Sequence, residues 1–166
     1  DLDRQAIEIT RLSLLLRSLA KREILPGLAD NIRQGNSLIS GTEEELRYYF
    51  GDDWEEKKPF NWEQEFEGIM AQGGFDVVIG NPPYVSIYKI STQPDEKQFF
   101  TDRFYTAYMK FDLYVLFIER ALSLLKNGGL FAFIVPGNFM VAPYGKNLRQ
   151  LLVDTTKVLQ IVDLME

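Results

Sequence analysis

The sequence predicts an α/β fold with a mostly parallel sheet. Two apolar segments, 75–79 and 130–135, are rich in β-branched and aromatic residues and are bounded by glycine or proline, as buried parallel strands are. Between them, residues 113–126 have the spacing of apolar side chains that is typical of a helix. A strand, a helix and a second strand in this order indicate an α/β sheet whose strands run mostly parallel.

The first forty residues predict one long helix and a short strand. Asp3 can cap a helix that runs to about residue 23 and is ended by Pro26 and Gly27. The apolar face of this helix consists of Ile7, Leu12, Leu15, Leu16 and Leu19. A short strand at 32–34 is then expected to lead into the tripeptide Gly35-Asn36-Ser37.

The remaining segments alternate between polar stretches and regular structure. Residues 41–70 are acidic and aromatic, and we interpret them as an acidic surface insertion with a short helix near 63–70, since runs of charge usually face solvent. A loop is expected after the strand at 75–79, up to about residue 110. Asn127-Gly128-Gly129 is typical of a left-handed helix cap. A helix at 146–154 and a last strand at 158–164 complete the order within one domain, 1–166.

Composition restricts the chemistry. The chain has no Cys and no His, which excludes disulfides, thiolate or imidazole metal sites, cysteine nucleophiles and Ser-His-Asp hydrolysis. The formal net charge of −6 disfavours this piece as the main surface that grips nucleic-acid phosphates. No signal peptide and no apolar run of membrane-spanning length is present, so we expect a cytoplasmic protein.

The residues that carry chemistry are Asn81-Pro82-Pro83-Tyr84, which follow the strand at 75–79 directly. Ligands of open α/β sheets bind at the carboxyl ends of strands. Two consecutive prolines fix the backbone and remove two N–H donors, so the loop presents the Asn81 side-chain oxygen and the Pro82 carbonyl as acceptors. Two acceptors beside an aromatic ring suit a planar amine, because they can each hold one amine hydrogen and localise the nitrogen lone pair. By itself the tetrapeptide could equally be a rigid turn.

The segment Asp76 to Tyr84 resembles the catalytic motif of amino-group DNA methyltransferases. Blocks around it resemble the adenine-specific methylases of restriction-modification systems, especially the fused type II enzymes. These blocks are Phe60-Asn61-Trp62 with Gly73-Gly74-Phe75, Asp112-Leu113-Tyr114 with Phe117 and Glu119, the Leu-Leu-Lys-Asn-Gly-Gly turn at 124–129, Phe133-Ile134-Val135-Pro136, and Tyr144-Gly145-Lys146 with Leu148-Arg149. Together they cover nearly the whole chain in the order of the family's motifs.

The resemblance implies a partial Rossmann-like, S-adenosylmethionine-dependent methyltransferase fold, and methyl transfer to the exocyclic amine of a flipped adenine in double-stranded DNA. It assigns catalysis to Asn81, Pro82 and Tyr84, and no metal. Asp1 matches the acid that binds the cofactor ribose, Leu2 matches the residue beside the cofactor adenine, and Asn36 with Ser37 matches the position that meets the adenine amine. Family members usually have Asp where this chain has Asn36. Pro83 and Phe117 match the lining of the methionine end, although Phe117 could equally be a core residue.

The family's glycine-rich first motif is absent, and no Gly-x-Gly sequence occurs anywhere in the chain. The chain also does not begin with Met, so we expect a piece of a longer protein. Without the glycine-rich loop that holds the methionine part of the cofactor, we expect the fragment alone to be inactive. Recognition and nuclease domains are expected elsewhere in the parent chain.

Two other functions stay open. The first is methylation of another planar amine, namely the cytosine amine, RNA guanine or protein glutamine; the long acidic interval before Asn81 favours DNA adenine instead. Methylation of a cytosine ring carbon is excluded, because it requires a Cys nucleophile. The second is a non-catalytic, methylase-like module that holds DNA, which cofactor binding by the parent would distinguish.

Overall fold

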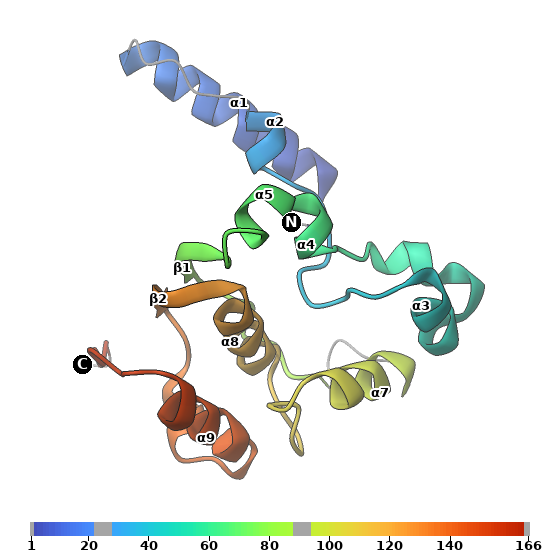
Figure 1. Cartoon of the computed structure of the whole chain (residues 1–166), viewed down its shortest axis with the longest axis vertical. Helices are drawn as coiled ribbons and strands as arrows, with labels where there is room; N and C mark the ends of the chain where they lie inside the picture. The colour runs from blue at the N-terminus through green and yellow to red at the C-terminus, as the bar shows by residue number, and fades with distance from the viewer. Residues whose placement is uncertain (1, 22–27, 88–93, 165–166) are drawn as a thin grey trace. The chain divides into compact units, whose positions relative to one another are not determined.

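The computed structural model describes residues 2–21, 28–87 and 94–164 (Figure 1). The chain divides into two compact units, an N-terminal unit, Asp1–Glu67, and a C-terminal unit, Gly68–Glu166. Among the described residues, no helix is both long enough and apolar enough to cross a membrane.

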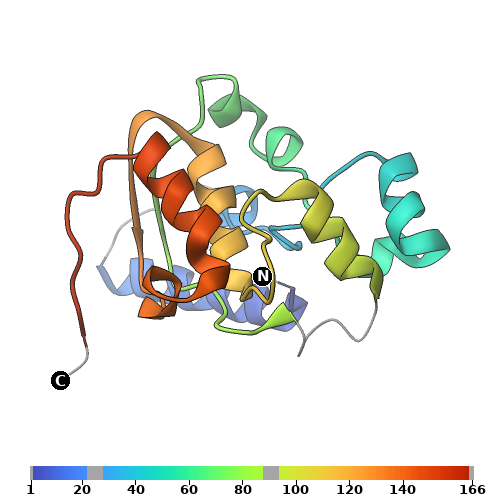
Figure 2. The same ribbon diagram turned by 90° about the horizontal axis from the view of Figure 1, so that it is seen from below.

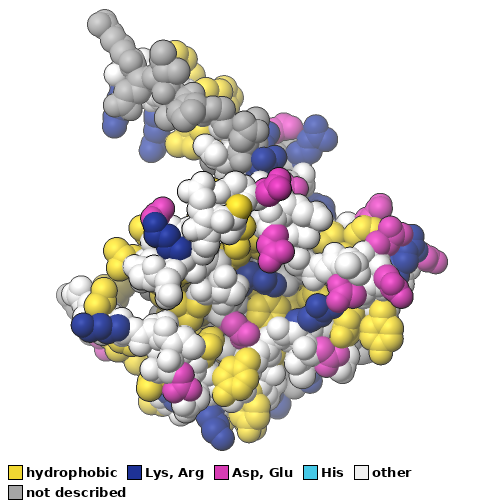
Figure 3. Space-filling view, viewed as in Figure 1, with side chains coloured by type: hydrophobic (Ala, Val, Ile, Leu, Met, Phe, Trp, Pro, Cys, Tyr) yellow, Lys and Arg dark blue, Asp and Glu magenta, His cyan; other side chains and the backbone are white. Residues whose placement is uncertain are grey.

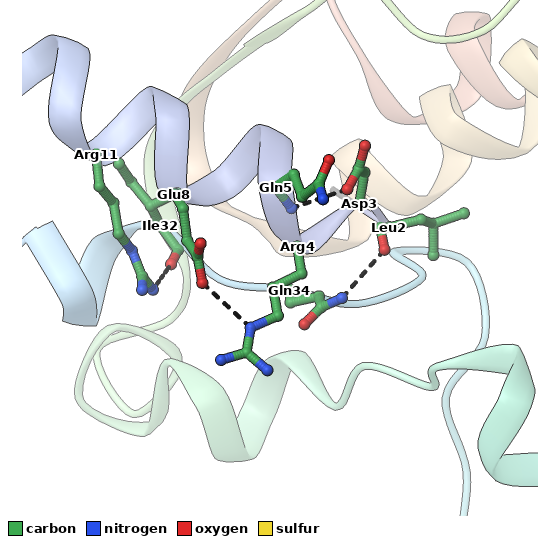
Figure 4. A network of polar contacts seen from close by, with 8 residues as sticks. All are labelled: Leu2, Asp3, Arg4, Gln5, Glu8, Arg11, Ile32 and Gln34. Atoms are coloured by element: carbon green, nitrogen blue, oxygen red, sulfur yellow. Dashed lines mark hydrogen bonds and ion pairs between the residues drawn. The ribbon is translucent and has the colours of Figure 1, made fainter.

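The N-terminal unit begins with α1 (Arg4–Lys21), which confirms the predicted long helix over its described part. The Asp3 carboxylate accepts a hydrogen bond from the Gln5 backbone N–H at 2.8 Å, as expected for a residue that caps the helix start (Figure 4). Of the predicted apolar face, however, only Ile7 is buried. The remaining members, Leu12, Leu15, Leu16 and Leu19, are exposed.

The strand predicted at 32–34 is wrong. The chain instead forms a single helical turn, α2 (Leu28–Asn31), which the Ile32 N–H closes by donating to the Leu28 carbonyl at 3.0 Å. The extended backbone that follows pairs only once, in an isolated parallel bridge between Asn36 and Pro59. A strand requires a continuous partner, and one bridge does not supply it.

The acidic segment at 41–70 contains more helix than the one short helix predicted there. The helix α3 (Glu43–Phe50) starts with a capping box, in which Thr42 and Glu45 satisfy each other's backbone N–H groups. A 3₁₀ stretch, η1 (Gly51–Lys57), follows. In place of one helix near 63–70 there are two short ones, α4 (Trp62–Glu65) and α5 (Glu67–Met70). They are separate because Phe66 leaves helical geometry.

The C-terminal unit confirms the predicted order of strand, helix and strand, but the second strand lies at 125–133 and not at the predicted 130–135. The strand β1 (Phe75–Gly80) pairs in parallel with β2 (Leu125–Phe133), and α8 (Leu113–Leu124) leads directly into β2 and packs against it (Figures 1 and 2). The helix ends two residues earlier than predicted. Asn127-Gly128-Gly129 therefore does not cap it but lies within β2, where the pairing with β1 is interrupted between Phe75 and Val77.

The predicted burial of the two strands is wrong. Val77 is 53% exposed and Ile79 75% exposed, and Leu130 on β2 is exposed as well. Among the described residues the sheet has only these two strands. The core of this unit is formed instead by α8, together with the aromatic residues of α7 (Pro94–Arg103). Its buried side chains include Phe99, Phe100, Phe104, Phe111, Leu113, Tyr114, Val115, Leu116 and Ile118.

The helix α7 lies in the segment predicted to be a loop, so that expectation is wrong for its second half. The predicted helix at 146–154 is confirmed as α9 (Lys146–Thr155), preceded by the 3₁₀ turns η2 (Gly137–Met140) and η3 (Pro143–Gly145). The strand predicted at 158–164 is absent, because its described residues are exposed and pair with no strand.

Candidate functional site

The predicted catalytic residues lie where β1 and β2 end. Gly80 and Phe133 are the last pair of the parallel sheet, and the Ile134 N–H still donates to the Gly80 carbonyl at 3.2 Å. Asn81 and Ile134 therefore leave the sheet next to each other, at its carboxyl edge. This is the edge at which open α/β sheets bind their ligands.

The structure brings Asn81 and Tyr84 together. The Tyr84 hydroxyl contacts the side-chain oxygen of Asn81 and also lies 2.8 Å from the Ile134 carbonyl oxygen. Asn81 is exposed and Tyr84 is 49% exposed, so both are accessible from solvent. Of the two prolines, Pro82 is buried and Pro83 is exposed. The loop is thus anchored by one proline and presents an amide and an aromatic ring outward.

A buried aromatic ring supports Tyr84 from behind. The rings of Tyr84 and Tyr114 meet edge to face, with centroids 6.4 Å apart and planes at 88°. Tyr114 is fully buried in α8 and also contacts the ring of Phe139 at 6.3 Å. Phe117, predicted to bind cofactor, lies three residues after Tyr114 on α8 and is half-buried.

Polar contacts extend this support to the start of α9. The hydroxyls of Tyr114 and Tyr144 are 2.9 Å apart, and the Tyr144 hydroxyl donates to the Asp112 carboxylate at 3.2 Å. Burial raises the pKa of both Tyr114 and Tyr144, so both hydroxyls keep their hydrogens at neutral pH. Sequence reasoning identified these three residues only as parts of family blocks, because nothing in their local sequence indicates that they meet.

Backbone pairing fixes the chain that follows the predicted catalytic loop. The Leu113 N–H donates to the Val85 carbonyl at 2.8 Å, and the Ile87 N–H donates to the Phe111 carbonyl at 3.2 Å. Ile87 is fully buried. The loop at 81–84 is therefore held at its start by the sheet and at its end by the residues that begin α8.

Three predicted cofactor residues, Leu2, Asn36 and Ser37, belong to the N-terminal unit, and Asp1 lies outside the described residues. Gln34 donates a hydrogen bond from its side chain to the Leu2 carbonyl at 3.1 Å (Figure 4). Asn36 accepts a hydrogen bond from the Leu38 N–H at 3.1 Å through its side-chain oxygen, and the Ser37 carbonyl accepts one from the Trp62 indole at 3.1 Å.

Lys58 connects these segments, and sequence reasoning missed it. Its ammonium group donates to the Leu2 carbonyl at 2.8 Å, and its own carbonyl accepts from the Asn36 N–H at 2.7 Å. Close packing also restricts this turn, because a Cβ atom on Gly35 would lie 2.5 Å from the Phe60 ring. The start of α1 and the Gly35-Asn36-Ser37 turn are thus held side by side. Among the described residues, no group of carboxylates is arranged to hold a metal ion.

Comparison with known proteins identifies the family. The family model described as "Eco57I restriction-modification methylase" matches residues 1–166. The chain is 32% identical over 140 residues to the type II restriction enzyme and methyltransferase RM.Eco57I of Escherichia coli, which covers 84% of this chain and 13% of that protein. It is 42% identical over 90 residues to the type II methyltransferase M.BstVI of Geobacillus stearothermophilus, covering 54% of this chain and 16% of the other.

The type II methyltransferase M.PaeR7I of Pseudomonas aeruginosa is 34% identical over 107 residues, which cover 63% of this chain and 18% of that protein. The chain thus spans less than a fifth of the length of each of these three relatives. The match of the family model, in contrast, extends over every residue of the chain, and the chain belongs to the Eco57I restriction-modification methylase family.

Proposed function

We propose that this chain carries the catalytic loop of an adenine-specific DNA methyltransferase, which transfers a methyl group from S-adenosylmethionine to the exocyclic amine of adenine in double-stranded DNA. One observation carries the proposal: an exposed amide, Asn81, and a half-exposed ring, Tyr84, are held together at the carboxyl end of a parallel strand. The relatives named as type II methyltransferases support the same reaction class.

The chemistry follows from the acceptors that the loop provides. The lone pair of an adenine amine is delocalised into the ring, which makes the nitrogen a poor nucleophile. The side-chain oxygen of Asn81 and the carbonyl of Pro82 would each accept one amine hydrogen and localise that lone pair on the nitrogen. Formation of the N–CH3 bond would break the S–CH3 bond, release S-adenosylhomocysteine and leave a cationic amine, which then loses one hydrogen to water. No histidine or thiolate base is required before the attack, which is consistent with a chain that has neither residue.

We infer that the ring of Tyr84 stacks on an extruded base, and the contacts of its hydroxyl are compatible with this role. In the described structure its hydroxyl contacts the Asn81 oxygen, the same atom that the target amine would use. The Ile134 carbonyl offers a second acceptor for this hydroxyl. When the amine occupies Asn81, the Tyr84 hydroxyl can therefore donate to Ile134 and keep its ring in place. Stacking of a base on such a ring stabilises the complex by about 1–3 kcal/mol.

The residues assigned to the cofactor suit a nucleoside with a methionine side chain. Leu2 offers an exposed apolar surface, and Lys58 holds it beside Asn36, whose amide can pair with a purine. In the N-terminal unit, Asp1 would hold the ribose and Ser37 would contact the adenine edge. Pro83 and Phe117 belong to the C-terminal unit, and we propose separately that they contact the methionine end of the cofactor. S-adenosylmethionine supplies an electrophilic methyl group when it is bound. Leu2 and Asn36 would orient its nucleoside.

The unit that contains the predicted catalytic loop differs in net charge from the N-terminal unit. The N-terminal unit has nine Lys and Arg against fifteen Asp and Glu, which accounts for the whole net charge of −6. The C-terminal unit has nine of each and is neutral. Acidic side chains gather over α3 in the space-filling view (Figure 3).

We propose that segment 41–70 is an acidic surface insertion. We also propose that DNA recognition and phosphate binding reside elsewhere in the parent chain, as does any nuclease.

Replacement of Asn81 by Ala in the full-length parent protein tests the proposal. The variant loses one preorganised acceptor in the transition state, which typically lowers the rate by about 10²–10³. Binding of S-adenosylmethionine should change much less, because Asn81 contacts mainly the target amine. Transfer of a labelled methyl group to unmethylated genomic DNA measures the rate, and calorimetry measures cofactor binding.

Asn127→Ala provides the matched control, since Asn127 is an exposed asparagine within β2 and is not part of the loop at 81–84. It should methylate DNA at the rate of the unchanged protein. Near-normal methylation by the Asn81→Ala variant would refute the proposed mechanism.

A further inference from the structure

A chain of three polar side chains ends at the ring that supports Tyr84. Asp112 precedes α8, Tyr114 lies in its first turn and Tyr144 precedes α9, yet their side chains are joined by contacts of 2.9 Å and 3.2 Å. The final member, Tyr114, is fully buried and has its ring against Tyr84. A route of direct contacts therefore leads from α9 to the predicted base-stacking ring.

The direction of the hydrogen bonds is fixed by the carboxylate. Asp112 accepts from Tyr144, which uses the only hydroxyl hydrogen that Tyr144 has. Tyr114 must then be the donor in its contact with the Tyr144 oxygen.

Asp112 is not used in the way its position predicts. It is the N-cap residue of α8, where an aspartate usually accepts a hydrogen bond from the first turn of the helix. Its side chain makes no such cap here and instead accepts from Tyr144. A side-chain cap stabilises the start of a helix, so an aspartate whose only role was to stabilise α8 would be expected to cap it.

We propose that Asp112, Tyr144 and Tyr114 are positioning residues for Tyr84: they fix the buried ring against which Tyr84 rests and thereby hold the stacking ring at the angle that the extruded base requires. This inference rests on the proposed function. Tyr144 contacts neither base nor cofactor in this scheme and acts only through Tyr114. The alternative is that the three residues simply attach α9 to α8.

Tyr144→Phe in the full-length parent distinguishes the two roles, because it removes one hydroxyl and keeps the ring. An edge-to-face pair is worth about 0.5–1.5 kcal/mol, so loss of its alignment should lower kcat for DNA methylation by about 2- to 10-fold. The KM for S-adenosylmethionine should stay unchanged. Labelled methyl transfer to unmethylated genomic DNA gives both values.

Asn147→Ala is the matched control. Asn147 lies on α9 and donates to the Tyr105 carbonyl at 2.7 Å, so its loss also removes one hydrogen bond between α9 and the rest of the unit, outside the polar chain. It should lower the melting temperature and leave kcat unchanged. If Tyr144→Phe behaves in the same way, with a lower melting temperature and an unchanged kcat, the positioning role is overturned.

Two further comparisons keep the inference testable if Tyr144→Phe folds poorly. Asp112→Asn keeps an acceptor oxygen and should restore most of the kcat that Asp112→Ala loses; equal kcat values for the two variants would overturn the inference.

In a Tyr84→Phe background, where the Tyr84 hydroxyl no longer anchors its ring, Tyr144→Phe should lower kcat by a larger factor than in the unchanged protein. If Asn81→Ala lowers the rate of methylation by about 10²–10³, as expected, while Tyr144→Phe and Asp112→Ala leave kcat unchanged, the positioning role alone is refuted. If Asn81→Ala methylates DNA normally, the proposed function itself is refuted.

Discussion

At the scale of single residues, the two acceptors near the Tyr84 hydroxyl determine how the predicted catalytic loop can work. One hydroxyl hydrogen can be given fully to only one acceptor at a time, either Asn81 or the Ile134 carbonyl. The first arrangement occupies the Asn81 oxygen, and the second leaves it open for a substrate amine. The hydroxyl therefore contributes to the position of the ring, whereas the ring itself would contact the base.

This division of roles predicts different effects of two substitutions at Tyr84 in the parent protein. Tyr84→Phe keeps the ring and should have a mild effect on methylation. Tyr84→Ala loses stacking worth about 1–3 kcal/mol and should have a severe effect. The defect of the Ala variant should shrink on DNA in which the target adenine is mismatched, because extrusion of that base costs less. Single-turnover rates on paired and mismatched duplexes measure this, and equal rates for the Ala variant on both would contradict the stacking role.

At the scale of elements, the entry into β1 depends on a glycine. Gly74 is buried at a positive φ of 112°, and its N–H donates to the Ile69 carbonyl at 3.1 Å. A Cβ atom at this position would lie 2.4 Å from the Leu124 carbonyl oxygen, where α8 ends and β2 begins. The close approach of the two backbones thus explains why glycine precedes β1.

Gly74→Ala should therefore destabilise the chain more than Gly128→Ala. Gly128 also has a positive φ, 80°, but a Cβ atom there would meet nothing within 4 Å. Both variants pay backbone strain of about 1–3 kcal/mol, and only Gly74→Ala adds a clash with backbone that must shift. Urea unfolding of the two variants gives the comparison, and equal losses of unfolding free energy would show that the approach to Leu124 is not restrictive.

Elements with long apolar periodicity could be predicted from the sequence, and those that depend on partners could not. The helices α1, α8 and α9 and the strand β1 were all expected close to their observed bounds. The helices α3 and α7 were missed although each has a readable start: a capping box at Thr42, and Pro94 followed by two acids. The strand predicted at 158–164 failed because an extended segment becomes a strand only when another one pairs with it.

In the candidate site, too, local features could be predicted from the sequence and contacts between distant residues could not. The tetrapeptide at 81–84 could be identified because its chemistry and its strand context are both local in sequence. The contacts of Tyr84 with Ile134 and Tyr114, and of Tyr144 with Asp112, join residues 30 or more positions apart. Sequence reasoning had named Tyr114 and Tyr144 in separate blocks and could not pair them. Lys58 carried no signal at all, since one lysine in a charged stretch is ordinarily a solvated side chain.

At the scale of the whole molecule, one face of the two-stranded sheet is apolar and uncovered. Val77 and Ile79 alternate with Val78 along β1, and their partners Leu130 and Ala132 lie on the same face of β2. These four side chains are exposed. Sheets of parallel strands are normally covered on both faces, so this surface is unusual for a protein in water.

Among the described residues β1 pairs with β2 alone, so its other edge is unpaired. We expect the purified chain of 166 residues to associate with itself through this face and this edge of β1, because uncovered apolar strands tend to pair with other chains. Light scattering over a range of concentrations measures the association. Ile79→Lys places a charge on the uncovered face and should shift the chain toward the monomer. Val141→Lys is the matched control, since Val141 is 85% exposed but lies between η2 and η3, outside the sheet. A chain that stays monomeric at every concentration, or an equal response to both lysines, would show that another surface governs its association.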